Sequence, residues 1–257
     1  MPTRLPRRMA ALALASTLSL GTAAGAEGVD LSTMTPEQRE LFRAEVRAYL
    51  LDNPEVIMEA VNALESRQAE QQAQGDVQLV QDHAEALFDD GYSYVGGNPD
   101  GDITIVEFSD YRCGYCRKAH PEISELIESD GNIRIILKEF PILGEASTTS
   151  SRFALATLLE AGPEAYKTMH DALITLQQDP TEPVLRRLAT TLGLDADAIL
   201  ARMGDEEITR RIDDTRALAR DMQINGTPSF VFGDQMLRGY VPLDAMRQVV
   251  EELRSEG

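Results

Sequence analysis

The chain has 257 residues and a formal net charge of −19 at pH 7, with 43 acidic side chains against 24 lysines and arginines. A chain this acidic is not expected to bind nucleic acid, because affinity for the phosphate backbone comes mainly from Lys and Arg. Anionic membrane surfaces should be avoided for the same reason.

The first 26 residues have the layout of a secretory signal. Arg4, Arg7 and Arg8 make a basic start, an apolar run follows from Met9 to Leu20, and small residues come next. This order predicts a signal peptide that is cleaved after Ala26, whereas a membrane anchor would need a longer apolar run. No other segment is apolar enough to span a bilayer. We therefore expect export to a bacterial periplasm, where disulfides can persist.

Residues 27–90 are predicted to form an N-terminal helical segment. Thr35 is a predicted N-cap, Pro36 takes the first helical position, and Gln38 completes a capping box. A second helix is predicted to start at Asn53, which can cap it.

The apolar side chains of this segment form narrow stripes at helical spacing, and a long polar run follows at residues 65–78. Two short amphipathic helices and a long polar one cannot bury much surface alone. They must pack on the rest of the chain or on copies of themselves, and we favour self-association. The stripes consist of Leu41, Phe42, Val46, Tyr49 and Leu50, then Ile57, Val61 and Leu64.

From Gly91 onward, at residues 91–257, strands and helices alternate. The β-branched run "ITIVEF" (103–108) predicts a buried strand, an amphipathic helix follows it, and "NIRIILKEF" (132–140) predicts a second strand. Strand, helix and strand in this order form a βαβ unit with a parallel pair. Residues 146–222 are predicted to be a helical insert.

The end of the chain predicts a hairpin and a helix. "PSFVFGDQMLRG" contains two short strands around Gly233-Asp234, a Gly-X turn signal. The stretch from Pro242 then reads as a closing helix. The fold class is therefore α/β, with the order β-α-β, helical insert, β-β-α.

Both cysteines of the chain, Cys113 and Cys116, lie between the first strand and its helix. The backbone N–H groups and dipole at a helix start lower a cysteine pKa, and a spacing of three residues permits a disulfide. A structural staple is not favoured, because so short a loop constrains the unfolded chain little. A zinc site is not favoured either, because His83, His120 and His170 are scattered and no second cysteine pair exists. A Cys-x-x-Cys pair in a βαβ unit indicates redox chemistry.

The motifs "VEFSDYRCGYC", "KEFPILG" and "INGTPSFVFG" resemble those of the DsbA class of thioredoxin-fold proteins over residues 103–254. The resemblance implies a thioredoxin fold with an inserted helical domain. It implies that Cys113 is the nucleophile and that Cys116 resolves the mixed disulfide. It also implies that Thr227 and Pro228 form a cis-proline loop that binds the substrate chain.

Three further residues are considered as part of the site, two of them through the resemblance and Lys138 through its place in the second strand. Glu107 occupies the position of a buried acid that takes the proton of Cys116 through water. Tyr115, between the cysteines, is expected to contact the substrate. Lys138 ends the second strand and is expected either to pair with Glu107 or to be a solvated lysine at the strand end.

Two features indicate the type of activity within the DsbA class. The dipeptide Gly114-Tyr115 between the cysteines, and Thr227 before the proline, resemble the residues that isomerases and reductases of the class have there more than those of its strong oxidase. With its N-terminal helices, the layout resembles the trimeric suppressor-of-copper-sensitivity C group. The resemblance implies a homo-oligomer, preferably a trimer, that shuffles disulfides in unfolded or wrongly bridged exported proteins. It also implies a membrane redox partner that resets the cysteines, with no cofactor and no resident metal. The alternatives are a monomeric dithiol oxidase and a copper(I) chaperone that uses Cys113 and Cys116.

Overall fold

The computed structural model describes residues 31–256. The expected signal peptide and its cleavage after Ala26 lie outside the described residues. The chain divides into two compact units, one that ends at Asn62 and one that begins at Ala63. No helix within residues 31–256 has the length and apolar character needed to cross a membrane.

The first unit opens with a short 3-10 turn, η1 (Leu31–Thr33), followed by α1 (Pro36–Asp52). The predicted capping box of α1 is confirmed. The backbone N–H of Gln38 donates to the hydroxyl oxygen of Thr35 over 3.2 Å, and the Thr35 N–H donates to Oε1 of Gln38 over 2.9 Å. Two of the backbone donors at the helix start are thereby satisfied.

The second helix differs from the prediction in two ways. Instead of a short helix and a separate polar one, α2 runs without a break over Glu55–Asp82, 28 residues. No proline interrupts this stretch, so the apolar and polar parts continue as one helix. The Asn53 side chain also caps the other helix, because its Nδ2 donates to the carbonyl oxygen of Tyr49 at the end of α1 over 2.9 Å.

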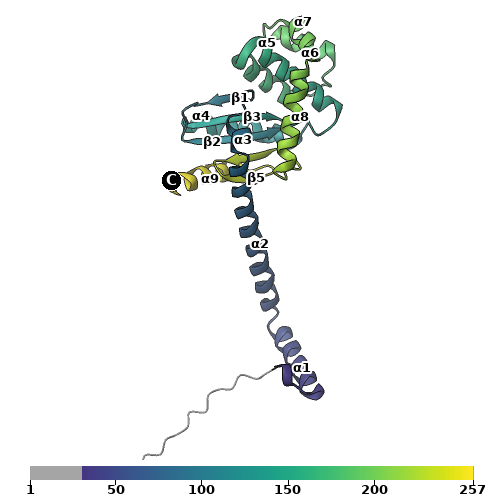
Figure 1. Ribbon diagram of the computed structural model, residues 1–257, viewed down its shortest axis with the longest axis vertical. Helices are drawn as coiled ribbons and strands as arrows, with labels where there is room; N and C mark the ends of the chain where they lie inside the picture. The colour runs from purple at the N-terminus through teal and green to yellow at the C-terminus, as the bar shows by residue number, and fades with distance from the viewer. Residues whose placement is uncertain (1–30, 257) are drawn as a thin grey trace, which may run out of the picture. The chain divides into compact units, whose positions relative to one another are not determined.

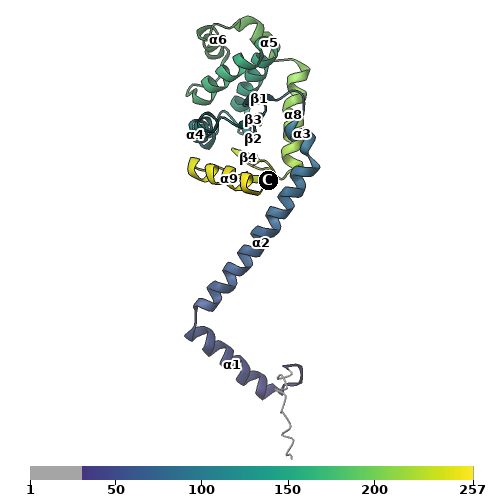
Figure 2. The same cartoon turned by 90° about the vertical axis from the view of Figure 1, so that its left-hand side faces the viewer.

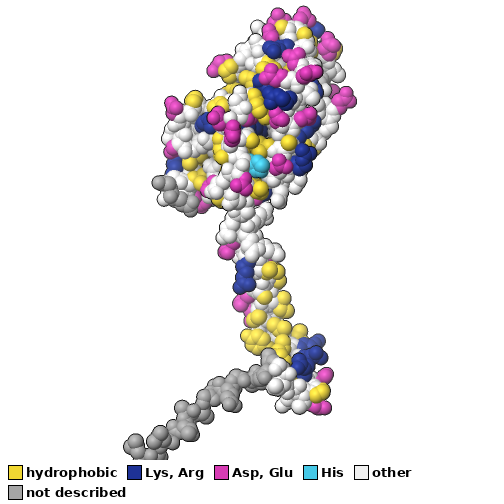
Figure 3. All heavy atoms as spheres, viewed as in Figure 1, with side chains coloured by type: hydrophobic (Ala, Val, Ile, Leu, Met, Phe, Trp, Pro, Cys, Tyr) yellow, Lys and Arg dark blue, Asp and Glu magenta, His cyan; other side chains and the backbone are white. Residues whose placement is uncertain are grey.

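Hydrophobic side chains lie exposed on α1 and on the first part of α2 (Figure 3). Leu41 is 71% exposed and Ile57 is 50% exposed. An apolar groove of about 320 Å³ lies between α1 and the start of α2, lined by side chains that include Phe42, Val46 and Ile57. These helices therefore present an apolar surface, the α1–α2 surface, whose large exposed members are Leu41, Phe42, Val46, Tyr49, Leu51, Ile57, Met58 and Val61.

The second unit contains a five-stranded sheet in the order β1-β3-β2-β4-β5. The pair β2 and β3 is parallel, as predicted, and the other pairs are antiparallel. The predicted hairpin is confirmed, with Gly233 at φ 57° in its turn. The strands are β1 (Tyr94–Gly97), β2 (Ile103–Ser109), β3 (Ile133–Glu139), β4 (Ser229–Phe232) and β5 (Gln235–Arg238).

Helices cover both faces of the sheet. In Figure 2, α4 and α9 lie on one side of it and α3 and α8 on the other, while the helical insert lies at one end of the unit. Within the insert, Gly162 at φ 84° divides α5 into two helical parts. The helices are α3 (Ala84–Phe88), α4 (Gly114–Asp130), α5 (Glu145–Thr175), α6 (Glu182–Thr191), α7 (Ala196–Arg202), α8 (Glu206–Asp221) and α9 (Leu243–Glu256) (Figure 1).

The sheet separates two hydrophobic cores. Alternate residues of β2 face opposite sides, so Ile105 packs in the core of α4 and α9, whereas Val106 and Phe108 pack in the other core. The same alternation in β3 assigns Leu137 to the first core and Ile136 to the second.

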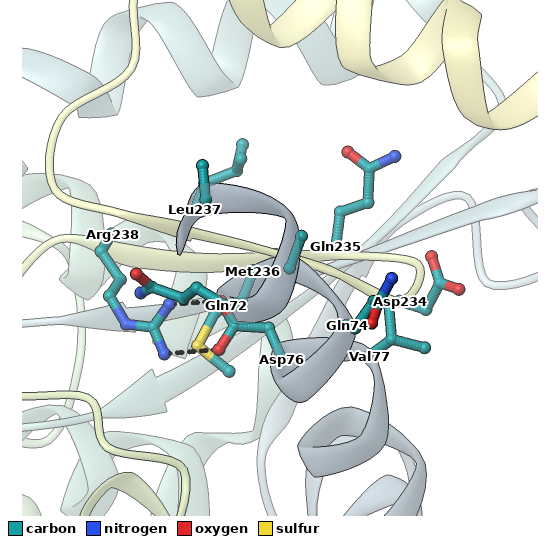
Figure 4. Close-up of a pocket in the computed structure, with 11 residues that line it drawn as sticks. Gln72, Gln74, Asp76, Val77, Asp234, Gln235, Met236, Leu237 and Arg238 are labelled. Carbon is teal, nitrogen blue, oxygen red and sulfur yellow. Dashed lines mark hydrogen bonds and ion pairs between the residues drawn. The ribbon is translucent and has the colours of Figure 1, made fainter. Parts of the chain in front are cut away.

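The C-terminal half of α2 belongs to the second unit. Asp76 accepts two hydrogen bonds from the Arg238 guanidinium, over 2.5 and 2.8 Å, beside the edge strand β5 (Figure 4). Val80 is 2% exposed and Leu87 is fully buried in the second core. The compact unit with the sheet therefore begins before Gly91, because residues 76–87 complete its core.

Candidate redox site

The two cysteines lie where β2 ends and α4 begins. Cys113 is the N-cap of α4, with an extended backbone (φ −76°, ψ 121°), and its N–H donates to the carbonyl oxygen of Asp110 over 3.0 Å. Cys116 lies in the first turn of α4 and is fully buried, whereas Cys113 is 7% exposed. Substrate can therefore reach the sulfur of Cys113 more readily than that of Cys116.

The two thiols have opposite electrostatic environments. The hydrogen bond from the Cys116 thiol, together with backbone N–H groups of Tyr115 and Cys116, lowers the pKa of Cys113 to about 5. The same hydrogen bond, burial and the nearby Glu107 carboxyl raise the pKa of Cys116 well above its ordinary value. At neutral pH the pair therefore holds one thiolate at Cys113 and one thiol at Cys116.

We expect alkylation of Cys113 in the reduced protein to keep its neutral-pH rate down to about pH 5 and to fall below it, because the thiolate is the reactive form. Labelling with iodoacetamide across pH, followed by peptide mass spectrometry, measures this. Cys116→Ala removes the main stabilising hydrogen bond and should move the inflection to higher pH. An inflection near the ordinary thiol value of about 8.5, or equal labelling of Cys116, would contradict this assignment.

A carboxyl group lies under the cysteine pair. Glu107 is 3% exposed, and burial raises its pKa to about 7, although a hydrogen bond with Ser109 and the charge of His120 act in the opposite direction. Because this carboxyl titrates near neutral pH and interacts with Cys116, it can exchange a proton with that thiol.

The position of Lys138 contradicts both expectations for it. In the parallel register Glu107 lies opposite Leu137, while Lys138 lies opposite Phe108 and so faces the other side of the sheet. There Nζ of Lys138 forms an ion pair with Asp90 over 2.5 Å and is 1% exposed. Pairing with Glu107 is therefore wrong, and so is a solvated lysine.

The Thr227–Pro228 loop lies beside the cysteines. Its peptide bond is cis. The carbonyl oxygen of Thr227 lies 3.1 Å from the sulfur of Cys113 and accepts a hydrogen bond when that thiol is protonated. Pro228 immediately precedes β4. The structure thus brings together Cys113, Cys116 and this loop from segments more than 100 residues apart.

Asp110 is a residue of this site that the sequence interpretation missed. It is fully buried, and its Oδ2 accepts from the N–H groups of Ile142 and Leu143 over 2.8 and 3.0 Å. Its Oδ1 accepts from the Arg112 N–H over 2.8 Å, which makes an Asx turn. One carboxylate therefore joins the cysteine loop to the loop after β3, and only the Asx turn had a signal in the sequence.

Exposed apolar side chains surround the cysteines. Tyr115 is 63% exposed and stacks near Tyr240, with ring centroids 6.2 Å apart. Ile142 and Leu143, held by Asp110, are exposed as well. Such a rim suits an extended polypeptide with apolar side chains.

Two histidines that seemed scattered in the sequence lie together. His120 on α4 and His170 on α5 have ring centroids 5.4 Å apart, and Asp171 lies beside them. The expectation that the histidines are scattered is therefore wrong for His120 and His170. The packing of α5 against α4 creates this pair, and neither helix indicates it alone.

A βαβ unit, a hairpin, a Cys-x-x-Cys pair at a helix start and a neighbouring cis-proline define a thioredoxin-fold protein. Residues 104–251 match the family described as DSBA-like thioredoxin domain, and residues 38–71 match the copper resistance protein ScsC N-terminal domain. The chain therefore belongs to the DsbA class of thioredoxin-fold proteins, in its ScsC-like group.

Solved structures agree with this assignment. A thioredoxin-like oxidoreductase from Silicibacter pomeroyi is 38% identical, with a TM-score of 0.62 over 66% of this chain and 97% of the other. Proteus mirabilis ScsC in a transitional conformation is 26% identical, with a TM-score of 0.63 over 88% of this chain and 99% of the other.

A curated relative is the Na(+)/H(+) antiporter NhaA 3 of Salinispora tropica. It is 28% identical over 170 residues, which make up 64% of this chain and 26% of the antiporter. The chain thus spans about a quarter of the length of the first curated relatives that it matches.

Proposed function

We propose that this protein catalyses thiol-disulfide exchange on exported polypeptides in the periplasm. The observation that carries the proposal is the lowered pKa of Cys113 at the start of α4, with the buried Cys116 thiol hydrogen-bonded to it. A solved relative described as a thioredoxin-like oxidoreductase supports it. Reduction of insulin by dithiothreitol, followed with and without the protein, tests it.

The exchange has two steps. The Cys113 thiolate attacks a sulfur of the substrate disulfide, forms a mixed disulfide and releases one substrate thiolate. Cys116 then gives up its proton, its thiolate attacks the Cys113 sulfur, and the second substrate sulfur leaves as the substrate becomes reduced. In isomerisation, another thiolate of the substrate attacks the substrate sulfur of the mixed disulfide before Cys116 reacts. A new disulfide then forms within the substrate, and Cys113 leaves as a thiolate.

The substrate chain binds beside the Thr227–Pro228 loop. Backbone groups of this loop can pair with an extended peptide, as in β-augmentation, which places a substrate sulfur next to Cys113. Tyr115 supplies an exposed ring for apolar side chains of the substrate. This arrangement selects unfolded or wrongly bridged proteins, because only they expose extended segments.

The protein isomerises and reduces disulfides in preference to forming them. It does so as a homo-oligomer, with a trimer favoured. An isomerase must start with a reduced, nucleophilic cysteine, and the lowered pKa of Cys113 makes it a thiolate at neutral pH, the form that attacks a wrong disulfide. The exposed α1–α2 surface and the match to the ScsC N-terminal domain support assembly of several chains. A membrane redox partner keeps the cysteines reduced.

We expect Glu107→Gln to slow resolution of the mixed disulfide by about 100-fold at pH 8, because the amide cannot accept the Cys116 proton. Stopped-flow measurement of mixed-disulfide decay across pH 5.5–8.5 (about one to two units either side of the Glu107 pKa) tests this. In the unchanged protein the rate should rise through about pH 7, and the variant should lack this rise. An unchanged pH profile would remove Glu107 from the mechanism.

The same variant should be more stable than the original protein. Burial raises the Glu107 pKa from 4.5 to about 7, so the stability associated with the protonated carboxyl is fully present below pH 4.5 and is lost as pH rises through 7. Glu107→Gln should therefore raise Tm more at pH 8 than at pH 4. Glu139→Gln is the matched control for the rate of resolution. Burial also raises the pKa of Glu139 to about 7, but this carboxyl contacts Tyr111 and Tyr166, so resolution of the mixed disulfide should remain fast in the variant.

A further inference from the structure

A second group of polar side chains lies behind the cysteines, between α4 and α5. One ring nitrogen each from His120 and His170 and one carboxylate oxygen of Asp171 lie within 4.8 Å of one another. We propose that these three residues bind one divalent transition-metal ion, with zinc preferred. Two imidazoles and one carboxylate form a ligand set typical of zinc, and a water molecule can take the fourth position.

Hydrogen bonds orient His170 as a metal ligand. The hydroxyl groups of Tyr111 and Tyr166 both donate to Oε1 of Glu139, over 2.7 and 2.6 Å. The Tyr111 proton is thereby used, so its oxygen accepts from Nδ1 of His170 over 3.0 Å. The proton of the imidazole is then on Nδ1, and Nε2 carries a free lone pair.

Metal-binding histidines usually donate their second ring nitrogen to a carboxylate, a carbonyl or a water, and here the Tyr111 oxygen, which is held by Glu139, takes that place. Within residues 31–256, Nε2 of His170 makes no hydrogen bond. The residue is 4% exposed, so few groups other than a small ion can reach this nitrogen. A nitrogen without a hydrogen-bond partner, on a side chain that a hydrogen-bonded frame holds in place, is the observation that points to a ligand.

The other two residues supply charge and access. Asp171 supplies the carboxylate, whose oxygens face His120 and Lys167. His120 Nε2 lies 3.2 Å from Oδ1 of Asp171, so both groups already face one another. Their side chains are 16% and 42% exposed, which leaves a route for the ion and for a water ligand.

Lys167 competes with the ion. Its Nζ donates to both carboxylate oxygens of Asp171, over 2.7 and 2.6 Å. The Lys167 side chain is 41% exposed, so its ammonium group can turn into solvent when a cation binds. The proposal therefore predicts that removal of this positive charge strengthens metal binding, which a purely structural ion pair would not produce.

The experiment is a Zn²⁺ titration of the full-length mature protein, without an affinity tag, in competition with a chromophoric chelator. Every protein in the titration carries both Cys113→Ser and Cys116→Ser, so that thiols cannot bind the metal. We expect one Zn²⁺ per chain. His120→Ala and Asp171→Asn should each weaken binding at least about tenfold, whereas Lys167→Gln should tighten it.

The third histidine of the chain provides the matched control. His83→Ala, which removes an imidazole outside the cluster, should leave the affinity unchanged. Zn²⁺ should shift the imidazole resonances of His120 and His170 in NMR spectra and leave those of His83 in place. Circular dichroism checks the fold of each variant, and Asp171→Asn, at a half-exposed position, keeps the test valid if His120→Ala is unstable.

The proposal is overturned if the protein binds no Zn²⁺ at micromolar concentration, or if binding persists unchanged in His120→Ala and Asp171→Asn. Weaker binding in Lys167→Gln, or loss of binding in His83→Ala, would overturn it as well. Because both cysteines are absent from the test, the result does not depend on the proposed exchange activity.

Discussion

Cys116→Ser is expected to accumulate mixed disulfides with exported proteins through Cys113, while Cys113→Ser should abolish insulin reduction. Cys113 has the lowered pKa and is the more exposed of the two cysteines, so we expect it to make the first attack. Cys116 is fully buried and its pKa is raised, so we expect it to act second and to release the substrate. In Cys116→Ser this release is blocked, and the covalent intermediate persists.

Non-reducing electrophoresis and peptide mass spectrometry measure the trapped species. The double variant Cys113→Ser/Cys116→Ser is the control and should trap nothing. If Cys113→Ser trapped clients through Cys116 instead, the two roles would be reversed. The N-cap position of Cys113 would then not identify the attacking thiol.

Deletion of residues 27–62 is expected to leave a folded monomer that still reduces insulin but cannot reactivate a scrambled disulfide substrate. The second compact unit begins at Ala63 and contains both cysteines and Pro228. In the proposed oligomer, isomerisation depends on several active sites near one client, and the deletion should remove their effective concentration together with the assembly. Sedimentation analysis and reactivation of scrambled ribonuclease measure the two effects.

The position of the cut decides whether this test works. A deletion up to residue 86 would remove Asp76, which pairs with Arg238, and Val80, which lies in the second core. Such a chain is expected to be unstable for reasons unrelated to assembly. The cut after Asn62 avoids this loss.

A point variant provides a second test of assembly. Val61→Asp places a charge on the α1–α2 surface, where Val61 is 40% exposed. It should dissociate the oligomer and abolish isomerisation without shortening the chain. Asp52→Asn at the end of α1 changes charge without adding one to the apolar stripe and should leave the assembly intact. A full-length protein that is monomeric yet isomerises substrates would contradict the proposed link between assembly and activity.

The sequence by itself determined the features that depend on short-range patterns. The strands β2 and β3, the capping box at Thr35, the Gly233 turn and the cysteine pair at a helix start were all predicted. Each rests on residues a few positions apart, where periodicity, turn geometry and helix capping act directly. The resemblance of three motifs then indicated the DsbA class, which the family matches confirm.

The tertiary structure decided the features that depend on register and packing. The strand β1 was not predicted, because half of its four residues are glycine, and pairing with β3 makes it a strand. Lys138 was expected either to pair with Glu107 or to be solvated, and neither holds, because the register turns it to the opposite face of the sheet, where it pairs with Asp90.

The cluster of His120, His170 and Asp171, and the bonds from Asp110 to the loop after β3, also came only from the tertiary structure. These contacts join residues 32 to 51 positions apart in the chain, which no local pattern relates. They form because helix packing and strand order bring distant segments together, and both are set by burial of the whole core.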